Sequence, residues 1–497
     1  MDRNRFRVWF DEFDVVPVWR DVIADDITPV AAFEALRGCG ERFVLESGEV
    51  DRSRDRFSFV GAGAALTMTR ERGRVRLRGL GLEGLSGEST KATLEAVLRR
   101  LRAPRVPGMP PLCTGLVGVL GAGSLQPWSG SAGESSGLRS LDALLLAPRT
   151  VVAFDHLRQT VRVIHSVFKA EHRDADEAFA AAASALDGAI GSLRRRRPPR
   201  LEPIPSFENR IEIATEVDDD AYGRMLLEAL DRVVAGEVEQ LAVSRRYRVD
   251  AEVAPLDVYR MLRIMNPSPY MYLLAVGGIG VVGSSPQSLV RLRDGLLGAS
   301  AIGGSSPRGA DSALDAAYAR ALVADPKEAS EHRQLVAQAR GDLAHLLRPG
   351  SIEVDPAPSV QLLSHIMHLV TTIRGELRED VSPLDVLAAT VPAGTVCGSP
   401  RREAMRIGRE IEGSSRGLYG GAVGYLDLCG DVDACIGIRT LFVEGRRYWS
   451  QAGASVVLGS EPAAEVRESA MKVKALFAAV AAAKGLREAA AGRAGGD

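Results

Sequence analysis

The alternation of apolar and polar positions along the chain predicts a mixture of strands and helices. Val75-Arg76-Leu77-Arg78 alternates with a period of two, as a strand with one buried face does. Residues 270–276 and 279–282 form two apolar runs joined by Gly277-Gly278, which predicts a hairpin. Further strands are expected at 15–19, 43–47, 56–60, 145–154, 160–168, 240–247, 420–426 and 434–442.

Helical patterns alternate with these strands. Pro29 follows Thr28 and is well tolerated at the first position of a helix, and Asp219 or Asp220 can cap another helix. The longer helices are expected at about 90–102, 174–190, 219–234, 311–347, 401–413 and 462–485. Helices that alternate with hairpins, without an internal repeat, predict an α+β fold with large antiparallel sheets flanked by helices.

A basic, proline-punctuated stretch interrupts the pattern near the middle of the chain. It runs from Arg194 to Pro203 and predicts a linker. We therefore expect an N-terminal region over 1–205, a second region over 206–485 and a flexible Ala/Gly-rich tail over 486–497. A single intertwined unit remains the alternative. The arginine run lacks interleaved aromatic residues, so we do not expect a nucleic-acid partner.

Composition narrows the class of protein further. The chain has 497 residues, 46% hydrophobic and 25% charged, with a net charge of −2, which is typical of a globular protein. Its five cysteines form no CxxC pair, so we expect reduced thiols and a cytoplasmic location. The charged N-terminus does not resemble a signal peptide. No apolar run approaches the roughly 20 residues of a membrane span, so no membrane contact is expected.

Two acidic motifs stand far apart in the sequence. Glu328 and Glu331 form one pair, and Glu465 and Glu468 form the other. A spacing of three residues places both carboxylates of a pair on one helix face. Such pairs are common on solvated helices, and that is the simpler interpretation of each motif alone. Four carboxylates that converge from two helices would instead make an oxygen-rich site suited to Mg²⁺.

Longer segments place these motifs in a known context. The segments are Asn266-Pro267-Ser268-Pro269-Tyr270-Met271, Ser364-His365-Ile366-Met367-His368, Pro392-Ala393-Gly394-Thr395, Arg416-Gly417-x-Tyr419, Ile438-Arg439-Thr440 and Gln451-Ala452-Gly453-Ala454. Together with Leu45-Glu46-Ser47 and Arg56-Phe57-Ser58-Phe59 nearer the N-terminus, they resemble the chorismate-utilising enzymes, specifically component I of anthranilate synthase. The resemblance extends over nearly the whole chain.

The resemblance implies a chorismate site with Mg²⁺ as cofactor. Glu331 and Glu468 would bind the metal directly, while Glu328 and Glu465 would hold metal-bound waters. The implied substrate-binding residues are Tyr419 and Arg439 for the enolpyruvyl carboxylate, and Gly394, Thr395 and Gly453 for the ring carboxylate. Lys472 follows Glu468 by four residues, so it either steadies that carboxylate or forms an ordinary surface pair.

Two further positions indicate the nucleophile. Family members that add water at carbon 2 use a lysine base where this chain has Gln240, and members that attack carbon 4 use a lysine where it has Gly303. Both differences favour ammonia attacking carbon 2, which gives 2-amino-2-deoxyisochorismate. No Cys-His-Glu glutaminase arrangement is found in the sequence. The ammonia would therefore come from a separate glutamine amidotransferase subunit or from solution.

Departures from the family pattern leave three functions open. The family's Ser-Pro-Glu is Ser285-Pro286-Gln287 here, and an amide cannot donate the acidic proton that the glutamate is thought to supply. This favours an aminating synthase of a natural-product (antibiotic) pathway that stops at the aminated product. His368 aligns with the histidine implicated in pyruvate elimination, so anthranilate synthase component I is the alternative. A catalytically impaired scaffold that binds a glutaminase is the third. Leu45-Glu46-Ser47 also resembles part of a tryptophan feedback pocket, which leaves inhibition by tryptophan open.

Overall fold

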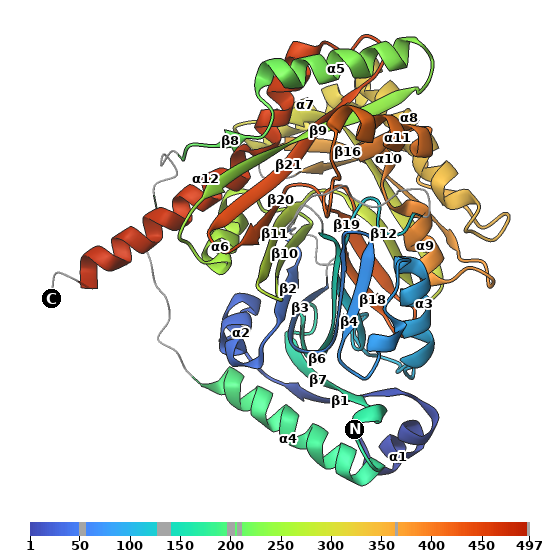
Figure 1. Ribbon diagram of the computed structural model, residues 1–497, viewed down its shortest axis with the longest axis vertical. Coiled ribbons are helices and arrows are strands. Elements are labelled where there is room, and N and C mark those ends of the chain that lie inside the picture. Colours follow the sequence, from blue (N-terminus) through green and yellow to red (C-terminus); the bar gives the residue numbers. More distant parts are fainter. Residues whose placement is uncertain (49–55, 127–140, 196–203, 206–210, 363–365, 495–497) are drawn as a thin grey trace.

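The computed structural model describes residues 1–48, 56–126, 141–195, 204–205, 211–362 and 366–494, with side chains described as far as Leu486. Within these ranges the strands form one connected antiparallel sheet that bends through the whole molecule (Figure 1). The α+β fold expected from the sequence is therefore confirmed.

The N-terminal strands form the base of the molecule, with α4 beneath them (Figure 1). The strands are β1 (Val15–Val22), β2 (Arg42–Glu46), β3 (Phe57–Glu71), β4 (Arg74–Arg78), β5 (Gly115–Leu120), β6 (Leu141–Asp155) and β7 (Thr160–Phe168). The helices are α1 (Arg3–Glu12), α2 (Pro29–Ala35), α3 (Thr90–Arg100) and α4 (Ala175–Arg194).

Later strands continue this base in two directions. One path runs β3–β2–β10–β11–β20–β21–β9, with β10 (Tyr270–Val276), β11 (Ile279–Ser285), β20 (Thr440–Glu444), β21 (Arg447–Val456) and β9 (Gln240–Asp250). The other runs β6–β5–β18–β19–β12–β13–β16, with β18 (Ala422–Asp427), β19 (Val432–Ile436), β12 (Ser288–Arg293), β13 (Leu296–Pro307) and β16 (Ile366–Glu376). The two halves of the sequence thus share one sheet, while the proposed domain boundary remains a prediction.

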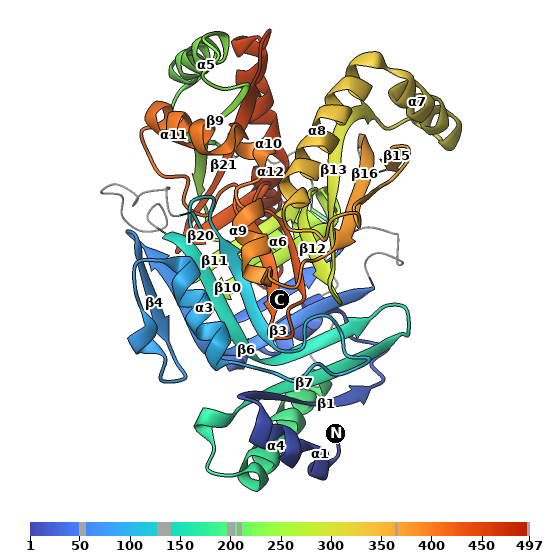
Figure 2. The same cartoon turned by 90° about the vertical axis from the view of Figure 1, so that its right-hand side faces the viewer.

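The ends of the two paths form two arms at the top of the molecule (Figure 2). The first arm holds α5 (Asp219–Val234), α11 (Arg401–Glu412), β9, β21 and part of α12 (Pro462–Ala494). The second holds α7 (Ser312–Ala324), α8 (Pro326–Ala344), β13 and β16. Shorter elements are α6 (Pro255–Met265), α9 (Pro383–Thr390), α10 (Gly394–Cys397), β8 (Ala214–Thr215), β14 (Glu353–Val354), β15 (Ser359–Leu362) and β17 (Gly398–Ser399).

The main core lies where α6 and α12 pack on the first path of the sheet. Tyr259 of α6, Tyr448 of β21 and Phe477 of α12 belong to one apolar cluster and are all fully buried. Burying a large aromatic side chain removes roughly 150–250 Å² from water, so this cluster anchors α12 firmly. The position of α12 matters because it carries Glu465 and Glu468.

Several local expectations are corrected by the structure. The helix expected over 311–347 is two helices, because Asp325-Pro326 ends α7 and starts α8 with proline at its first position. Asp218, and not Asp219 or Asp220, caps α5. The strand expected over 434–442 is β19 and β20. Helix α12 continues past residue 486, where we expected the tail.

The hairpin prediction at Gly277-Gly278 is confirmed, with Val276 opposite Ile279. The strands expected at 145–154 and 160–168 are β6 and β7, which pair with each other. In the described part of the chain, no helix combines the length and the apolar character needed to cross a membrane.

Candidate active site

The two acidic motifs lie on the two arms. Glu328 and Glu331 are in the first turns of α8, and Glu465 and Glu468 are in the first turns of α12. Glu328 accepts the backbone N–H of Ser305 at 2.8 Å, and Glu331 lies 3.8 Å from Lys327. Among the residues that the structure describes, no three of these four carboxylates have oxygen atoms within 4.8 Å of one another.

On α12, burial and the adjacent negative charge of Glu468 raise the pKa of Glu465. Lys472 lies 2.6 Å from Glu468 and also donates to the backbone carbonyl of Gly453 at 2.9 Å. Lys472 therefore does more than form a surface pair, since it ties the acidic motif to strand β21. This contact brings Gly453, Glu468 and Lys472 together.

Arg439 and Tyr419 lie beside this group. The Arg439 guanidinium donates to the backbone carbonyl of Lys472, and Arg439 has a left-handed backbone with φ of 51°. The pKa of Arg439 is lowered by burial, and this effect outweighs the opposite effects of the neighbouring Tyr419 and Glu468. Burial raises the pKa of Tyr419 to about 12, which keeps its hydroxyl protonated as a hydrogen-bond donor. A half-buried guanidinium and a buried phenol are suited to a carboxylate ligand.

His368 faces the same region from the second arm. It lies on β16, half-buried, with Nδ1 3.3 Å from the carbonyl oxygen of Gly304. Burial is the main cause that lowers the pKa of His368, and the positive charge of Arg439 lowers it further. The imidazole is therefore neutral near pH 7 and can accept a proton.

Three other predicted residues share one cavity. Gln287, Gly394 and Thr395 line it, together with Gln338 and Asp342 of α8. A side chain at position 394 would force the Gln338 side chain to move, since its Nε2 lies 1.7 Å from the place of a Cβ atom. The hydroxyl of Thr395 is buried without a hydrogen-bond partner, so it is available to a ligand.

Gln240 lies away from this cavity, at the start of β9. Its amide nitrogen donates to the hydroxyl of Ser455 on β21, and its backbone pairs with Ser399. Gln240 therefore has a structural partner in addition to the role that the resemblance implies.

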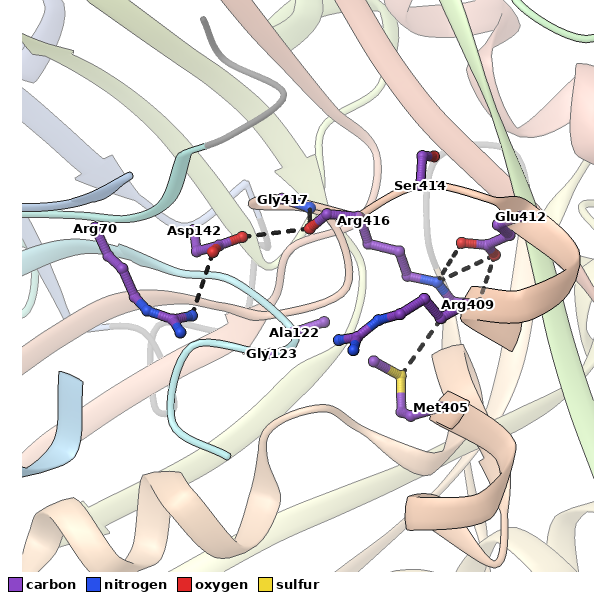
Figure 3. Close-up of a pocket in the computed structure, with 11 residues that line it drawn as sticks. Arg70, Ala122, Gly123, Asp142, Met405, Arg409, Glu412, Ser414, Arg416 and Gly417 are labelled. Atoms are coloured by element: carbon purple, nitrogen blue, oxygen red, sulfur yellow. Dashed lines mark hydrogen bonds and ion pairs between the residues drawn. The ribbon is translucent and has the colours of Figure 1, made fainter. Parts of the chain in front are cut away.

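A buried ion pair that we did not predict supports Tyr419. Arg416 and Glu412 are 2.6 Å apart, almost completely buried, and point toward each other in Figure 3. Arg416 also donates to the carbonyls of Val396 and Ala242 at 2.6 and 2.7 Å. The pair thus joins α11, α10 and β9 below the loop that leads to Tyr419. Its spacing of four residues was the available signal in the sequence.

His332 ends the first acidic motif of the sequence, Lys327-Glu328-x-x-Glu331-His332, which gave no role for it. Its Nδ1 lies 3.0 Å from the carbonyl oxygen of Gly303, and its Nε2 lies 2.8 Å from the hydroxyl of Thr371. The side chain is buried and joins α8 to β13 and β16. It fixes the helix face that presents Glu328 and Glu331.

Comparison with known proteins decides the family. A family model described as chorismate binding enzyme matches residues 41–478. The chain belongs to this family. An anthranilate synthase component 1 from Mycolicibacterium smegmatis is 38% identical over 98% of this chain and 94% of its own length. One from Pseudomonas aeruginosa is 33% identical over 97% of this chain and 99% of its own.

Solved structures agree with the fold. Anthranilate synthase component I from Streptococcus pneumoniae has a TM-score of 0.74 at 28% identity, covering 85% of this chain and 92% of its own. The menaquinone-specific isochorismate synthase from Escherichia coli has a TM-score of 0.69 at 19% identity, covering 96% of this chain and 98% of its own, and supports the fold alone. This protein is therefore a chorismate-utilising enzyme of the anthranilate synthase component I type.

Proposed function

We propose that this protein catalyses the reaction of anthranilate synthase component I: amination of chorismate at carbon 2 followed by elimination of pyruvate. Relatives with that name match nearly the full chain, which favours this function over a synthase that stops after amination. The observation that carries the proposal is the state of His368. Its imidazole is half-buried near Arg439, and burial lowers the pKa of His368.

The chemistry requires two steps. In the first, ammonia forms a bond to carbon 2 and loses a proton, while the hydroxyl at carbon 4 leaves and takes up a proton to become water. In the second, the proton on carbon 2 is removed, the bond between carbon 3 and the enolpyruvyl oxygen breaks, pyruvate leaves and the ring becomes aromatic. We assign the removal of the proton on carbon 2 to His368, because a neutral imidazole can accept a proton near pH 7. Arg439 and Tyr419 hold the enolpyruvyl carboxylate.

We further propose Mg²⁺ as the cofactor. Four carboxylates on α8 and α12 offer the hard oxygen ligands that Mg²⁺ prefers. Burial, and secondly the charge of Glu468, raise the pKa of Glu465, and a bound cation would offset both effects. Glu331 and Glu468 would bind it directly, and Glu328 and Glu465 through water. When bound, Mg²⁺ supplies charge neutralisation at the ring carboxylate. A glutamine amidotransferase subunit is the proposed ammonia source.

The test is incubation of the protein with chorismate, Mg²⁺ and an ammonium salt, followed by mass spectrometry, anthranilate fluorescence and a coupled pyruvate assay. We expect anthranilate and pyruvate in equal amounts. His368→Gln should accumulate the aminated intermediate, while His345→Gln at the end of α8 serves as the matched control. Anthranilate formation at the wild-type rate by His368→Gln would overturn the assignment of His368.

A second candidate function stops at the aminated product, and Gln287 favours it. Its side chain lines the same cavity as Gly394 and Thr395, where it can hydrogen-bond to a leaving oxygen but cannot protonate it. Aminated product without pyruvate from the wild-type protein would support this candidate. A large gain in turnover by Gln287→Glu would instead support a catalytically impaired protein, whereas a loss would show that the amide belongs to a working site.

A further inference from the structure

Two thiols and a carboxylate converge far from the candidate active site. Cys113 lies just before β5, and Asp427 and Cys429 lie at the turn between β18 and β19. Their sulfur and oxygen atoms all lie within 4.8 Å of one another. In the part of the chain that the structure describes, this is the only such group of three potential metal ligands.

Backbone hydrogen bonds hold the group in place. The carboxylate of Asp427 accepts the N–H groups of Cys113 at 2.9 Å, Thr114 at 2.8 Å and Cys429 at 2.9 Å. The Cys113 thiol interacts with the Cys429 thiol, and the Cys429 thiol interacts with the Asp427 carboxylate. The three side chains are therefore fixed toward one another by the fold, and are not a chance encounter of mobile surface groups.

The surroundings allow an ion to enter and be held. Cys113 and Asp427 are 4% and 2% exposed, whereas Cys429 is half-buried and gives access from solvent. The Cys429 sulfur lies 3.3 Å from the carbonyl oxygen of Pro104, which offers a fourth ligand.

The nearby cation Arg105 is already neutralised. Its guanidinium donates to the Cys429 carbonyl and forms ion pairs with Asp431 at 2.9 Å and Asp294 at 2.5 Å. Its charge is thus offset by two carboxylates outside the cluster, which weakens its repulsion of a bound cation.

We propose that Cys113, Asp427 and Cys429 bind a thiophilic divalent cation of the Zn²⁺ class. Each thiol would release its proton to solvent as a sulfur–metal bond forms, and no electron transfer is involved. Zinc takes tetrahedral sites with sulfur at about 2.3 Å, so two thiolates would stand about 3.8 Å apart. The ligand atoms of the cluster lie within 4.8 Å of one another, so small side-chain rotations would bring the two sulfur atoms to this distance.

The site is separate from the candidate active site. Asp427 ends β18, whereas Tyr419 precedes its beginning. Six strand residues span about 20 Å. A metal here would fasten the β18–β19 turn to the segment before β5, so its role is structural. The proposal does not depend on the reaction catalysed.

The experiment uses chelator-treated, reduced protein kept in excess Mg²⁺, so that the carboxylates of α8 and α12 are already supplied with a cation. Titration with Co²⁺ should give a thiolate-to-cobalt charge-transfer band that saturates at one ion per chain, and Zn²⁺ should abolish it. Cys429→Ser and Cys113→Ser should each lose the band. Cys39→Ser, which changes an exposed thiol, is the matched control and should keep it.

Thermal melting gives a second readout. Zn²⁺ should raise the melting temperature of the wild type and Cys39→Ser, but not of Cys429→Ser. If Cys113→Ser does not fold, the cobalt titration and melting of Cys429→Ser, which changes a half-buried thiol, test the proposal. The absence of a band in the wild type, or an unchanged band in Cys429→Ser, overturns the proposal. The proposal is also overturned if the reduced protein takes up no metal and instead forms a Cys113–Cys429 disulfide in air.

Discussion

At the residue scale, the candidate site depends on charged and polar groups held away from water. Burial raises the pKa of Tyr419 and lowers that of His368, so the phenol stays a hydrogen-bond donor and the imidazole stays neutral near pH 7. Burial also lowers the pKa of Arg439, which neighbouring Tyr419 and Glu468 oppose. Residue types and family motifs allowed these residues to be named from the sequence. The sequence could not predict their protonation states or their contacts with one another, because both depend on burial by strands that are distant in the sequence.

Replacement of Arg416 tests how much the buried Arg416–Glu412 ion pair stabilises the fold near Tyr419. Arg416→Met removes one partner of a buried pair and leaves the Glu412 carboxylate uncompensated, so we expect a loss of about 3–5 kcal/mol in unfolding free energy. Urea denaturation measures it. Arg406→Met removes a guanidinium that pairs with Glu403 and Glu410 on the exposed face of the same helix, and should leave the midpoint nearly unchanged. Equal losses in both variants would contradict this explanation.

His165 should make stability depend on pH. Burial, followed by the charges of Arg149 and His172, lowers the pKa of His165 from 6.5 to about 4. Between these values the unfolded chain takes up a proton that the folded chain does not, so stability falls as the pH falls from 6.5 toward 4. The loss is about 3 kcal/mol at most. Urea midpoints across this range should vary less in His165→Gln, whereas the exposed His345→Gln should retain the wild-type slope.

At the element scale, local signals in the sequence predicted most helices and hairpins. The β10–β11 hairpin followed from Gly277-Gly278, since a two-residue glycine turn fixes the register. The break between α7 and α8 was missed although Pro326 was visible, because the apolar pattern continues across it. The pairing of β2 with β10 and of β5 with β18 joins segments that are hundreds of residues apart, and no local pattern specifies such partners.

The cap of α8 connects helix stability to the proposed metal site. Asp325 accepts the N–H groups of Lys327 and Glu328 at 2.8 and 3.1 Å. Asp325→Ala should cost about 1 kcal/mol and loosen the turn that carries Glu328. We expect the Mg²⁺ concentration for half-maximal turnover to rise by up to about fivefold.

The matched control for this prediction is Asp311→Ala. Asp311 caps α7 in the same way, by accepting the N–H of Leu314 at 2.9 Å, but α7 carries no proposed ligand. Its loss should lower stability by a similar amount without changing the Mg²⁺ requirement. An equal change in that requirement in both variants would show that Asp325 acts only through general stability.

At the scale of the whole molecule, one continuous sheet supports two arms that each carry part of the candidate site. Glu328, Glu331 and His368 belong to the arm of α8 and β16, while Glu465, Glu468 and Lys472 belong to the arm of α12 (Figure 2). The sequence predicted both acidic motifs but not which arm carries each of them, because spacing within a helix says nothing about how two helices are placed.

The division of the acidic motifs between two arms leads to a prediction about motion. Ligands of one Mg²⁺ lie about 2.1 Å from the ion, so Glu331 and Glu468, the proposed direct ligands, must have oxygen atoms within about 4.2 Å of each other when the ion is bound. Among the described residues, no three of the four carboxylates have oxygen atoms within 4.8 Å of one another, so the four do not form a compact cluster. We therefore expect the two arms to approach when Mg²⁺ and chorismate bind together. Fluorophores at the exposed positions Arg224 on α5 and Arg320 on α7 would report this as increased energy transfer.

The control is the same labelled protein with Glu331→Gln and Glu468→Gln. These changes keep the size of both side chains but remove the charges that would draw the arms together, so ligand addition should leave energy transfer unchanged. Mg²⁺ alone should produce a smaller change than Mg²⁺ with chorismate, because the ring carboxylate supplies a further ligand that spans the gap. Constant energy transfer in the wild type under turnover would mean that the two acidic motifs act separately, and the shared metal site would have to be abandoned.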